Sequence, residues 1–347
     1  SWTIDRRHIE LGLRFCVALW RFWWRQGYVA EGRRYLDQLL AHSSQVQDAA
    51  LLRLRSQALH GAGVLARVHG DLAQAHAMHE QNLVLRRSLQ DGPGTVASLN
   101  SLGVVAMFTG DYDRAEACFS EGLVLAQTQG HEREIYTVKL NQGVVAMYQG
   151  DYARARALHE EVLEYHRRNG EMNSVAASLG NLGDVLRYQG DHAHAHTLLV
   201  ESLELMRRLN DRAGASITLT SLGRVALCQG DADRALIYLA ESLRLQRETG
   251  DQSNMGDLLE ATAHAAAMKR QWSRGARLCG AAAAVRASTG VRASPADTEE
   301  HARCLESVTQ NLSAERMAIL IAEGRELSIE QLGAELADLR RDAPMEF

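Results

Sequence analysis

The chain has 347 residues, 46% of them hydrophobic and 23% charged, which is typical of a folded protein and unlike a disordered one. The formal net charge is −5 and no basic run occurs, so direct binding to nucleic acid is not expected. No stretch reaches the ~18 to 20 uninterrupted apolar residues that a membrane helix requires, so no membrane span is expected either.

The first 45 residues are predicted to form a divergent helical hairpin that caps the N-terminal end of the fold. Residues 19–41 read as two helices with Gly27 at the turn between them. Four of the five tryptophans lie in the first 24 residues: Trp2, Trp20, Trp23 and Trp24. They either pack this hairpin or contact a domain upstream of it, and the sequence leaves both interpretations open.

A repeat of 40 residues follows this hairpin. Its mark is a Gly-Asp pair, which recurs at Gly70-Asp71, Gly110-Asp111, Gly150-Asp151, Gly190-Asp191 and Gly230-Asp231. Seven residues before each pair stands another glycine: Gly63, Gly103, Gly143, Gly183 and Gly223. No linker rich in Pro, Ser or Gly interrupts residues 48–290. We therefore predict one continuous array of about six repeats over residues 46–290, the last of them degenerate.

Each Gly-Asp pair is predicted to be the turn between two helices. Gly110 ends the first helix, because a residue without Cβ enters the left-handed conformation at little cost. Asp111 then caps the second helix by accepting a backbone N–H. Gly103, inside the first helix, is expected to let the second helix approach closely. Further stops close each hairpin, at Gly130, Gly170, Asn210 and Gly250.

The period is lost after Gly290, and residues 291–347 are predicted to form C-terminal capping helices. The segment Ser294-Pro295-Ala296-Asp297 has the pattern of a helix start, with a cap, a proline in the first turn and an acid three residues on. Helices are expected near residues 295–311, 314–323 and 329–340, folded over the last repeat.

Residues 101–126, SLGVVAMFTGDYDRAEACFSEGLVLA, resemble the tetratricopeptide repeat (TPR) family. The matching positions at the family's spacing are Leu102, Gly103, Gly110, Asp111, Tyr112, Ala115 and Phe119. The chain departs from the family pattern at Leu99, where an aromatic residue is usual, and it lacks the usual proline after the second helix. The resemblance implies an all-α fold, a right-handed α-solenoid superhelix of TPR hairpins with divergent N- and C-terminal caps.

The ends of the chain carry a narrower resemblance, to the TPR region of bacterial STAND-type ATPase regulators, a group that includes a maltotriose-responsive activator. It rests on the Trp-rich opening and on EGRELSIEQLGAELA at residues 323–337. It implies that an ATPase and a winged-helix segment precede the repeats in the full-length protein. The 40-residue repeats are also similar to those of the polarity scaffold Pins, which implies a freestanding scaffold instead.

No sequence motif predicts catalysis or cofactor binding, so we expect no enzyme activity, no catalytic residue and no cofactor. The two lysines of the chain, Lys139 and Lys269, do not follow the glycine-rich turn of a P-loop. No GxSxG, HExxH or EF-hand pattern occurs either. The five cysteines are scattered and lack CxxC spacing, which indicates reduced thiols and a cytoplasmic protein.

The histidines offer one pattern that resembles a metal site. His192 and His196 lie four residues apart on a predicted helix and could share a cation. Position 192 is tyrosine in two other repeats, however, so we prefer packing between helices and predict no metal site. His79 and His159 stand at the repeat position of Phe119 and are expected in the core or at its edge.

The TPR resemblance implies that the first helix of each hairpin lines a concave binding face. One column of this face changes from apolar to charged along the chain: Val64, Val104, Val144, Asp184, Arg224 and His264. The alternative is that these residues are solvated or pack between helices, or that Asp184 and Arg224 pair with each other. The predicted ligand- or partner-binding residues are Asn100, Val104, Met107, Phe108, Val144, Tyr148, Asp184, Arg187, Tyr188, Arg224 and His264.

A groove with an aromatic half and a charged half suits an amphipathic peptide, a protein partner, or a sugar-like effector that stacks on Phe108 and Tyr148. Together with such a groove, the resemblance to STAND-type regulators implies a sensor or interaction module of a bacterial STAND-type ATPase or transcriptional regulator. The alternative is a freestanding TPR scaffold that binds partner peptides in the same groove.

Overall fold

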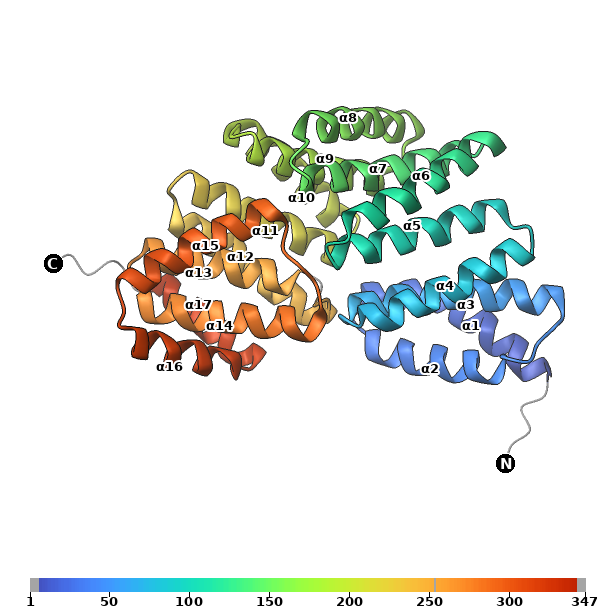
Figure 1. Ribbon diagram of the computed structural model, residues 1–347, viewed down its shortest axis with the longest axis horizontal. Helices are drawn as coiled ribbons and strands as arrows, with labels where there is room; N and C mark the ends of the chain where they lie inside the picture. The colour runs from blue at the N-terminus through green and yellow to red at the C-terminus, as the bar shows by residue number, and fades with distance from the viewer. Residues whose placement is uncertain (1–5, 253, 342–347) are drawn as a thin grey trace. The chain divides into compact units, whose positions relative to one another are not determined.

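The computed structural model describes residues 6–252 and 254–341, and within them every regular element is a helix (Figure 1). This confirms the all-α prediction. The chain divides into two compact units, residues 1–145 (unit 1) and 146–347 (unit 2). No described helix is long and apolar enough to cross a bilayer.

The described part of unit 1 is a stack of helical hairpins, in which α3 packs on α1 and α2, and α5 packs on α4 and α6. Trp20 and Trp23 of α1 are buried in the core of the first hairpin, whereas Trp2 lies outside the described residues. The helices are α1 (Arg6–Arg25), α2 (Val29–His42), α3 (Ala49–Val68), α4 (Leu72–Ser88), α5 (Gly92–Phe108), α6 (Tyr112–Gln129) and α7 (Glu132–Tyr148), whose last turn belongs to unit 2.

Unit 2 is itself a stack of hairpins and ends in three further helices. Its elements are α8 (Tyr152–Asn169), α9 (Met172–Tyr188), α10 (His192–Arg208), α11 (Arg212–Cys228), α12 (Ala232–Thr249), α13 (Met255–Met268), α14 (Trp272–Thr289), α15 (Pro295–Gln310), α16 (Ala314–Arg325) and α17 (Ile329–Arg341). The last three confirm the helices expected near 295–311, 314–323 and 329–340.

The turn chemistry is as the repeat pattern predicts. Gly110 has φ 78°. Among the described residues three stops are not glycine: Gln90, Asn210 and Arg270 have φ 51°, 54° and 57°, in the left-handed region that Asn tolerates best of the three. The Asp111 carboxylate accepts the Arg114 N–H at 3.1 Å. The same cap, to the N–H three residues on, is made by Asp71, Asp151, Asp191 and Asp231. In the degenerate hairpin α13–α14, the side chain of Gln271 makes no such bond.

Close helix packing explains the glycines inside the first helices. A Cβ on Gly103 would lie 2.5 Å from Cε1 of Phe119, which is fully buried. A Cβ on Gly63 would lie 2.5 Å from the His79 ring. His79 and His159 are 1% and 0% exposed, which confirms that they are core residues.

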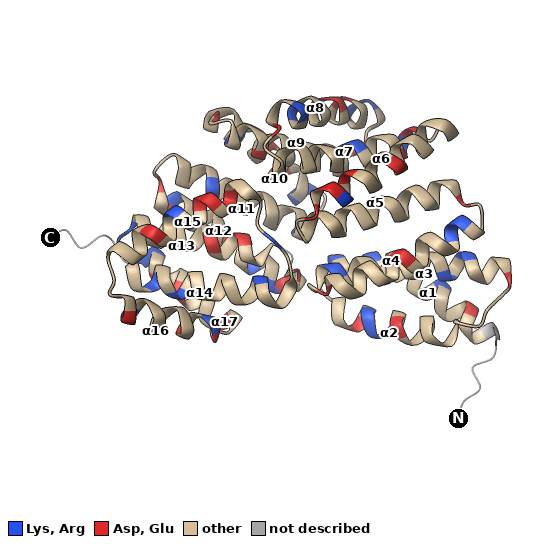
Figure 2. Ribbon diagram, viewed as in Figure 1, with Lys and Arg blue, Asp and Glu red and all other residues tan. Residues whose placement is uncertain are grey.

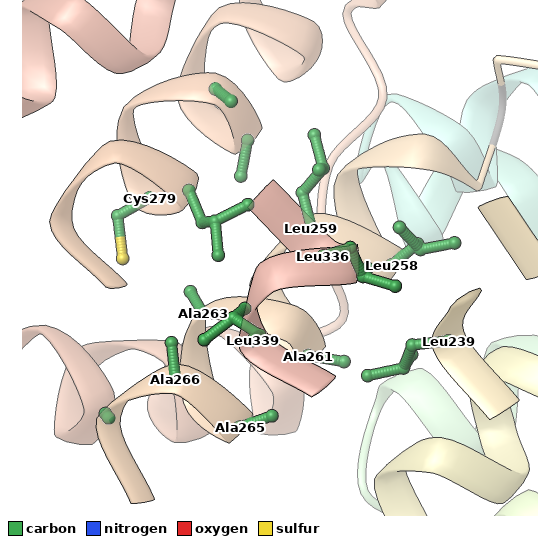
Figure 3. Close-up of a cluster of buried hydrophobic side chains, with 14 of the residues drawn as sticks. Leu239, Leu258, Leu259, Ala261, Ala263, Ala265, Ala266, Cys279, Leu336 and Leu339 are labelled. Carbon is green, nitrogen blue, oxygen red and sulfur yellow. The ribbon is translucent and has the colours of Figure 1, made fainter. Parts of the chain in front are cut away.

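The three last helices attach to unit 2 in two ways. Helix α17 packs on α12 and α16 packs on α14. Leu336 and Leu339 of α17 lie in one apolar cluster with Leu258 and Leu259 of α13 (Figure 3). Helix α15 packs on α13 and α14 and also reaches back to α9 through ion pairs, which places it over the first helices of unit 2.

Candidate functional site: a charge cluster and pocket under α15

The repeat period brings charged side chains from three first helices of unit 2 to one wall. Positions 184, 224 and 264 are 40 residues apart, so Asp184 of α9, Arg224 of α11 and His264 of α13 occupy equivalent places. Arg187 and Tyr188 stand one turn further along α9. Helix α15 covers this wall with the carboxylates of its first turns. Both signs of charge occur together on the helices around α11, α13 and α15 (Figure 2).

Two arginines of the wall bind the first turn of α15. Arg187 Nη2 donates to Asp297 Oδ1 at 3.1 Å, and Arg187 Nη1 lies 3.6 Å from Glu300 Oε2. Arg224 Nη1 contacts Asp297 Oδ1 and lies 3.9 Å from Glu300 Oε2. Both arginines are 6% exposed and Asp297 is 8% exposed. These ion pairs are therefore largely removed from water.

Neutral and aromatic groups complete the contact with α15. Tyr188 donates its hydroxyl hydrogen to Asp297 Oδ2 at 2.7 Å, and its ring lies under the Arg187 guanidinium at 4.0 Å. His264 Nδ1 lies 3.0 Å from Glu300 Oε1. The four wall side chains in direct contact with Asp297 or Glu300 are therefore hydrogen-bond donors: Arg187, Arg224, Tyr188 and His264.

A second layer of ion pairs fixes the position of Arg224. Its Nη2 donates to Asp257 Oδ1 at 3.0 Å. Arg286 of α14 donates to the same oxygen at 3.1 Å and to both Glu260 oxygens at 2.6 and 2.7 Å. We call the eight ionic residues the charge cluster: Asp184, Arg187, Arg224, Asp257, Glu260, Arg286, Asp297 and Glu300.

The pKa values in the charge cluster separate the carboxylates of the wall from those of α15. Burial raises the pKa of Asp184 and of Asp257. Burial acts in the same sense on Asp297, but Arg224 and Arg187 hold its pKa well below the usual range. The pKa of Glu300 is also lowered, because the hydrogen bond from His264 and the charges of Arg224 and Arg187 outweigh burial. The α15 carboxylates are thus the ones that the wall stabilises as anions.

A pocket of about 560 Å³ adjoins the charge cluster, between α15 and the wall. Tyr152 stands at its edge and stacks on Tyr188, with ring centroids 5.5 Å apart. The residues on the wall side include Tyr152, Arg187, Tyr188, Cys228 and His264, and those on α15 include Glu299, Glu300 and Arg303. This volume is in the range of pockets that hold small ligands or peptide side chains.

The structure brings together five of the predicted binding residues: Asp184, Arg187, Tyr188, Arg224 and His264. The alternative of a direct Asp184–Arg224 pair is wrong. Asp184 instead accepts a hydrogen bond from Ser221 at 3.0 Å and lies 3.7 Å from Arg187 Nε. Tyr148, also in unit 2, is partly buried at the end of α7.

The predicted residues of unit 1 show no comparable gathering of charge. Met107 is only 7% exposed. The face of Phe108, expected to be open for stacking, has the Arg67 guanidinium 5.3 Å from its centroid. Asn100 accepts a hydrogen bond from Asn141 at 2.9 Å. Val104 and Val144 are partly buried on α5 and α7.

Sequence reasoning missed Asp297 and Glu300. The helix start at Ser294 was readable, and Ser294 does cap α15 by accepting the Asp297 N–H at 3.1 Å. Nothing in the local pattern says which wall these carboxylates face. Their separation from Arg187 by more than 100 residues is a property of the tertiary fold.

The histidine pair at 192 and 196 lies on α10. The His196 ring contacts Arg234 and Tyr238 of α12. Among residues 6–252 and 254–341, no three His, Cys, Asp or Glu side chains gather as a metal site would require.

The chain carries tetratricopeptide repeats, since residues 134–208 and 174–248 each match the tetratricopeptide repeat family model. No curated protein sequence matches the chain.

Solved TPR structures share the fold at low identity. A Rap protein complexed with competence and sporulation factor is 12% identical, with a TM-score of 0.63 over 94% of this chain and 99% of that one. NprR in complex with its cognate peptide NprX is 13% identical, with a TM-score of 0.61 over 90% and 88%. A STAND protein with a tetratricopeptide repeat sensor, from Pyrococcus horikoshii, is 12% identical, with a TM-score of 0.54 over 89% of this chain and 50% of that one.

Proposed function

We propose that this TPR chain is the sensor and interaction module of a bacterial, cytoplasmic STAND-type ATPase or transcriptional regulator, and that it binds a peptide or protein segment at the α15 side of unit 2. An ATPase and a winged-helix segment would precede it in the full-length protein. The observation that carries the proposal is the charge cluster with its adjoining pocket. The residues of the wall stand at repeat positions whose side chains differ from hairpin to hairpin.

The repeat separates these positions from those that build the scaffold. Helix-packing residues such as Gly183 and Gly223 are retained from hairpin to hairpin, whereas position 184 is aspartate and position 224 is arginine. Burying charged groups brings little net stability compared with apolar residues of similar volume. Apolar residues would stabilise the stack at least as well, so we infer that these charges serve recognition.

The comparisons support a peptide over a sugar as the occupant. The Rap and NprR structures are complexes with peptide factors, and the Pyrococcus horikoshii protein couples a TPR sensor to an ATPase. A sugar-like effector remains the competing ligand class. The alternative function, a freestanding TPR scaffold, would bind partner peptides at the same surface. It differs from the STAND-type regulator in having no ATPase attached to the chain.

The test starts from the unmodified chain and uses a peptide library together with a panel of oligosaccharides. Selected peptides are expected to bind at the pocket edge, so Tyr152→Ala lowers their affinity about fivefold to tenfold through the loss of an aromatic contact worth about 1 kcal/mol. Titration calorimetry measures this change.

Tyr112→Ala is the matched control, because Tyr112 occupies the same repeat position on α6 and lies outside the pocket. Peptides that bind both variants equally well would contradict the proposed site. Oligosaccharides that raise the melting temperature while no peptide binds would replace the peptide with a sugar effector.

A further inference from the structure

We propose that α15 is an internal substitute for the partner, and that an acidic helical segment with two carboxylates one turn apart displaces it from Arg187 and Arg224. This inference rests on the proposed function and names the partner's chemistry. In this state the binding wall is closed by the chain itself, so partner binding requires the release of α15.

Helix α15 is attached differently from its neighbours. The buried side chains of α17 are Leu332, Leu336 and Leu339, which an apolar core holds in place. Those of α15 are Asp297, Cys304 and Val308. At ~25 cal/mol per Å² of apolar area, the last two supply much less burial than three leucines. The N-terminal half of α15 thus depends on ion pairs and hydrogen bonds.

Ion pairs of this kind make an exchangeable attachment. Their attraction is offset by the loss of hydration when the charges are buried. When α15 lifts away, water reaches Asp297, Glu300 and the two arginines, and it restores the hydration that docking removed. Release of the N-terminal half of α15 therefore exposes little apolar surface, because the buried Cys304 and Val308 lie in its C-terminal half, and it leaves the leucines of α17 in place.

The wall that α15 leaves behind selects for an acidic replacement. Arg187 keeps the 3.7 Å contact with Asp184 and its place over the Tyr188 ring, and Arg224 shares Asp257 with Arg286. Tyr188 and His264 lose the carboxylates to which they are hydrogen-bonded. The groups that lose a carboxylate of α15 are donors, and two carboxylates at i and i+3 of a helix satisfy them as Asp297 and Glu300 do.

The experiment releases α15 and supplies its own sequence in trans. The double variant Asp297→Asn, Glu300→Gln of the full chain removes both negative charges with little change of shape. The probe is a fluorescent peptide of residues 293–311 with Ser in place of Cys304. We expect it to bind the double variant at least tenfold more tightly than the unmodified chain, as measured by anisotropy. Hydrogen exchange is expected to rise in α15 and to stay unchanged in α17.

Two controls make the result specific. Glu306→Gln changes an exposed α15 carboxylate outside the charge cluster, and this variant should bind the probe as weakly as the unmodified chain does. A probe that itself carries Asp297→Asn and Glu300→Gln should bind the released chain at least tenfold more weakly. Unchanged exchange in α15 of the double variant, or equal binding of both probes, overturns the inference.

A covalent lock tests the same step in the opposite direction. The buried thiols of Cys279 on α14 and Cys304 on α15 lie in one core cluster and interact with each other. Oxidation with diamide, which takes two electrons and two protons from the thiols, should join these helices and abolish probe binding to the double variant until dithiothreitol is added. Retained binding in the fully oxidised protein contradicts displacement of α15.

The two proposals fail separately. Library peptides that bind at Tyr152 but are unaffected by release of α15 would sink this inference and leave the proposed function standing. If the α15 probe exchanges in trans but no external peptide or protein binds, the proposed function fails and the displacement of α15 stands.

Discussion

Units 1 and 2 are built by the same repeat but differ at the column of positions 40 residues apart. In unit 1 the column holds Val64, Val104 and Val144, which are partly buried. In unit 2 it holds Asp184, Arg224 and His264, which meet the carboxylates of α15. Glycine stops and aspartate caps recur in both units. The comparison teaches that hairpin packing and surface chemistry are encoded by separate positions of one repeat.

The largest expected loss of stability comes from removing a charge from the part of the column in unit 2. A substitution at the same repeat position in unit 1 serves as the comparison. Arg224→Met removes the cation shared by the buried Asp297 and the partly buried Asp257, each of which keeps one other arginine. We therefore expect a loss of about 3 kcal/mol of unfolding free energy, the lower end of the range for one partner of a buried ion pair. Val104→Met at the same repeat position in unit 1 should change it by less than about 1.5 kcal/mol.

Urea unfolding with hydrogen exchange on the same samples measures both changes. The loss in Arg224→Met should appear first in α15. Equal effects of the two substitutions would remove the distinction between the columns.

A smaller loss of stability is expected at the glycines inside the first helices, which allow close helix packing in both units. Gly103→Val should cost about 2–3 kcal/mol, because the new side chain meets Phe119, which is fully buried and has no room to move. Gly223→Val in unit 2 meets Leu239 at 2.9 Å and should cost less, because a leucine changes rotamer more readily than an aromatic ring changes place. Thermal unfolding of the two variants gives the order, and the reverse order would contradict this account of the glycines.

Acid should distinguish the units by their buried histidines. In unit 1, burial together with nearby arginines lowers the pKa of His60 to about 4, and burial lowers that of His79 to about 3. In unit 2, burial lowers the pKa of His159 to about 4. These rings stay neutral in the folded state, so their stabilisation is complete above pH 6.5 and is lost as the pH falls from 6.5 toward 4. Each contributes about 1.4 kcal/mol per pH unit in that window.

Hydrogen exchange at pH 6.5 and 5.5, corrected for the intrinsic rate, should therefore show a larger loss of protection around α3 and α4 than around α8. His79→Phe, which copies the residue at position 119, should reduce the loss in unit 1. If His79→Phe loses as much protection between pH 6.5 and 5.5 as the unmodified chain, this interpretation is wrong.

The scaffold was largely readable from the sequence because its signals are local. Gly110 and Asp111 act within one turn of the chain, and the 40-residue period repeats them often enough to fix the register. The charge cluster was only half readable. Arg187 and Arg224 follow from the period, but Asp297 lies on a helix outside the repeat, and only the tertiary fold brings it to them. The openness expected for Phe108 was likewise lost to a neighbouring side chain, Arg67.

The smallest expected effect tests whether the shared turn operates equally in both units. Asp111→Ala and Asp231→Ala each remove one cap, to the Arg114 N–H at 3.1 Å and to the Arg234 N–H at 2.9 Å. Each should cost about 1 kcal/mol in chemical unfolding, whereas asparagine at either position should cost only a few tenths of that because its side-chain oxygen accepts the same bond. Equal losses of unfolding free energy in the two alanine variants would mean that the turns are equivalent. The units would then differ only at the column of positions 40 residues apart and in α15. A clearly larger loss at Asp231 would mean that the turns of unit 2 also take part in holding the charge cluster.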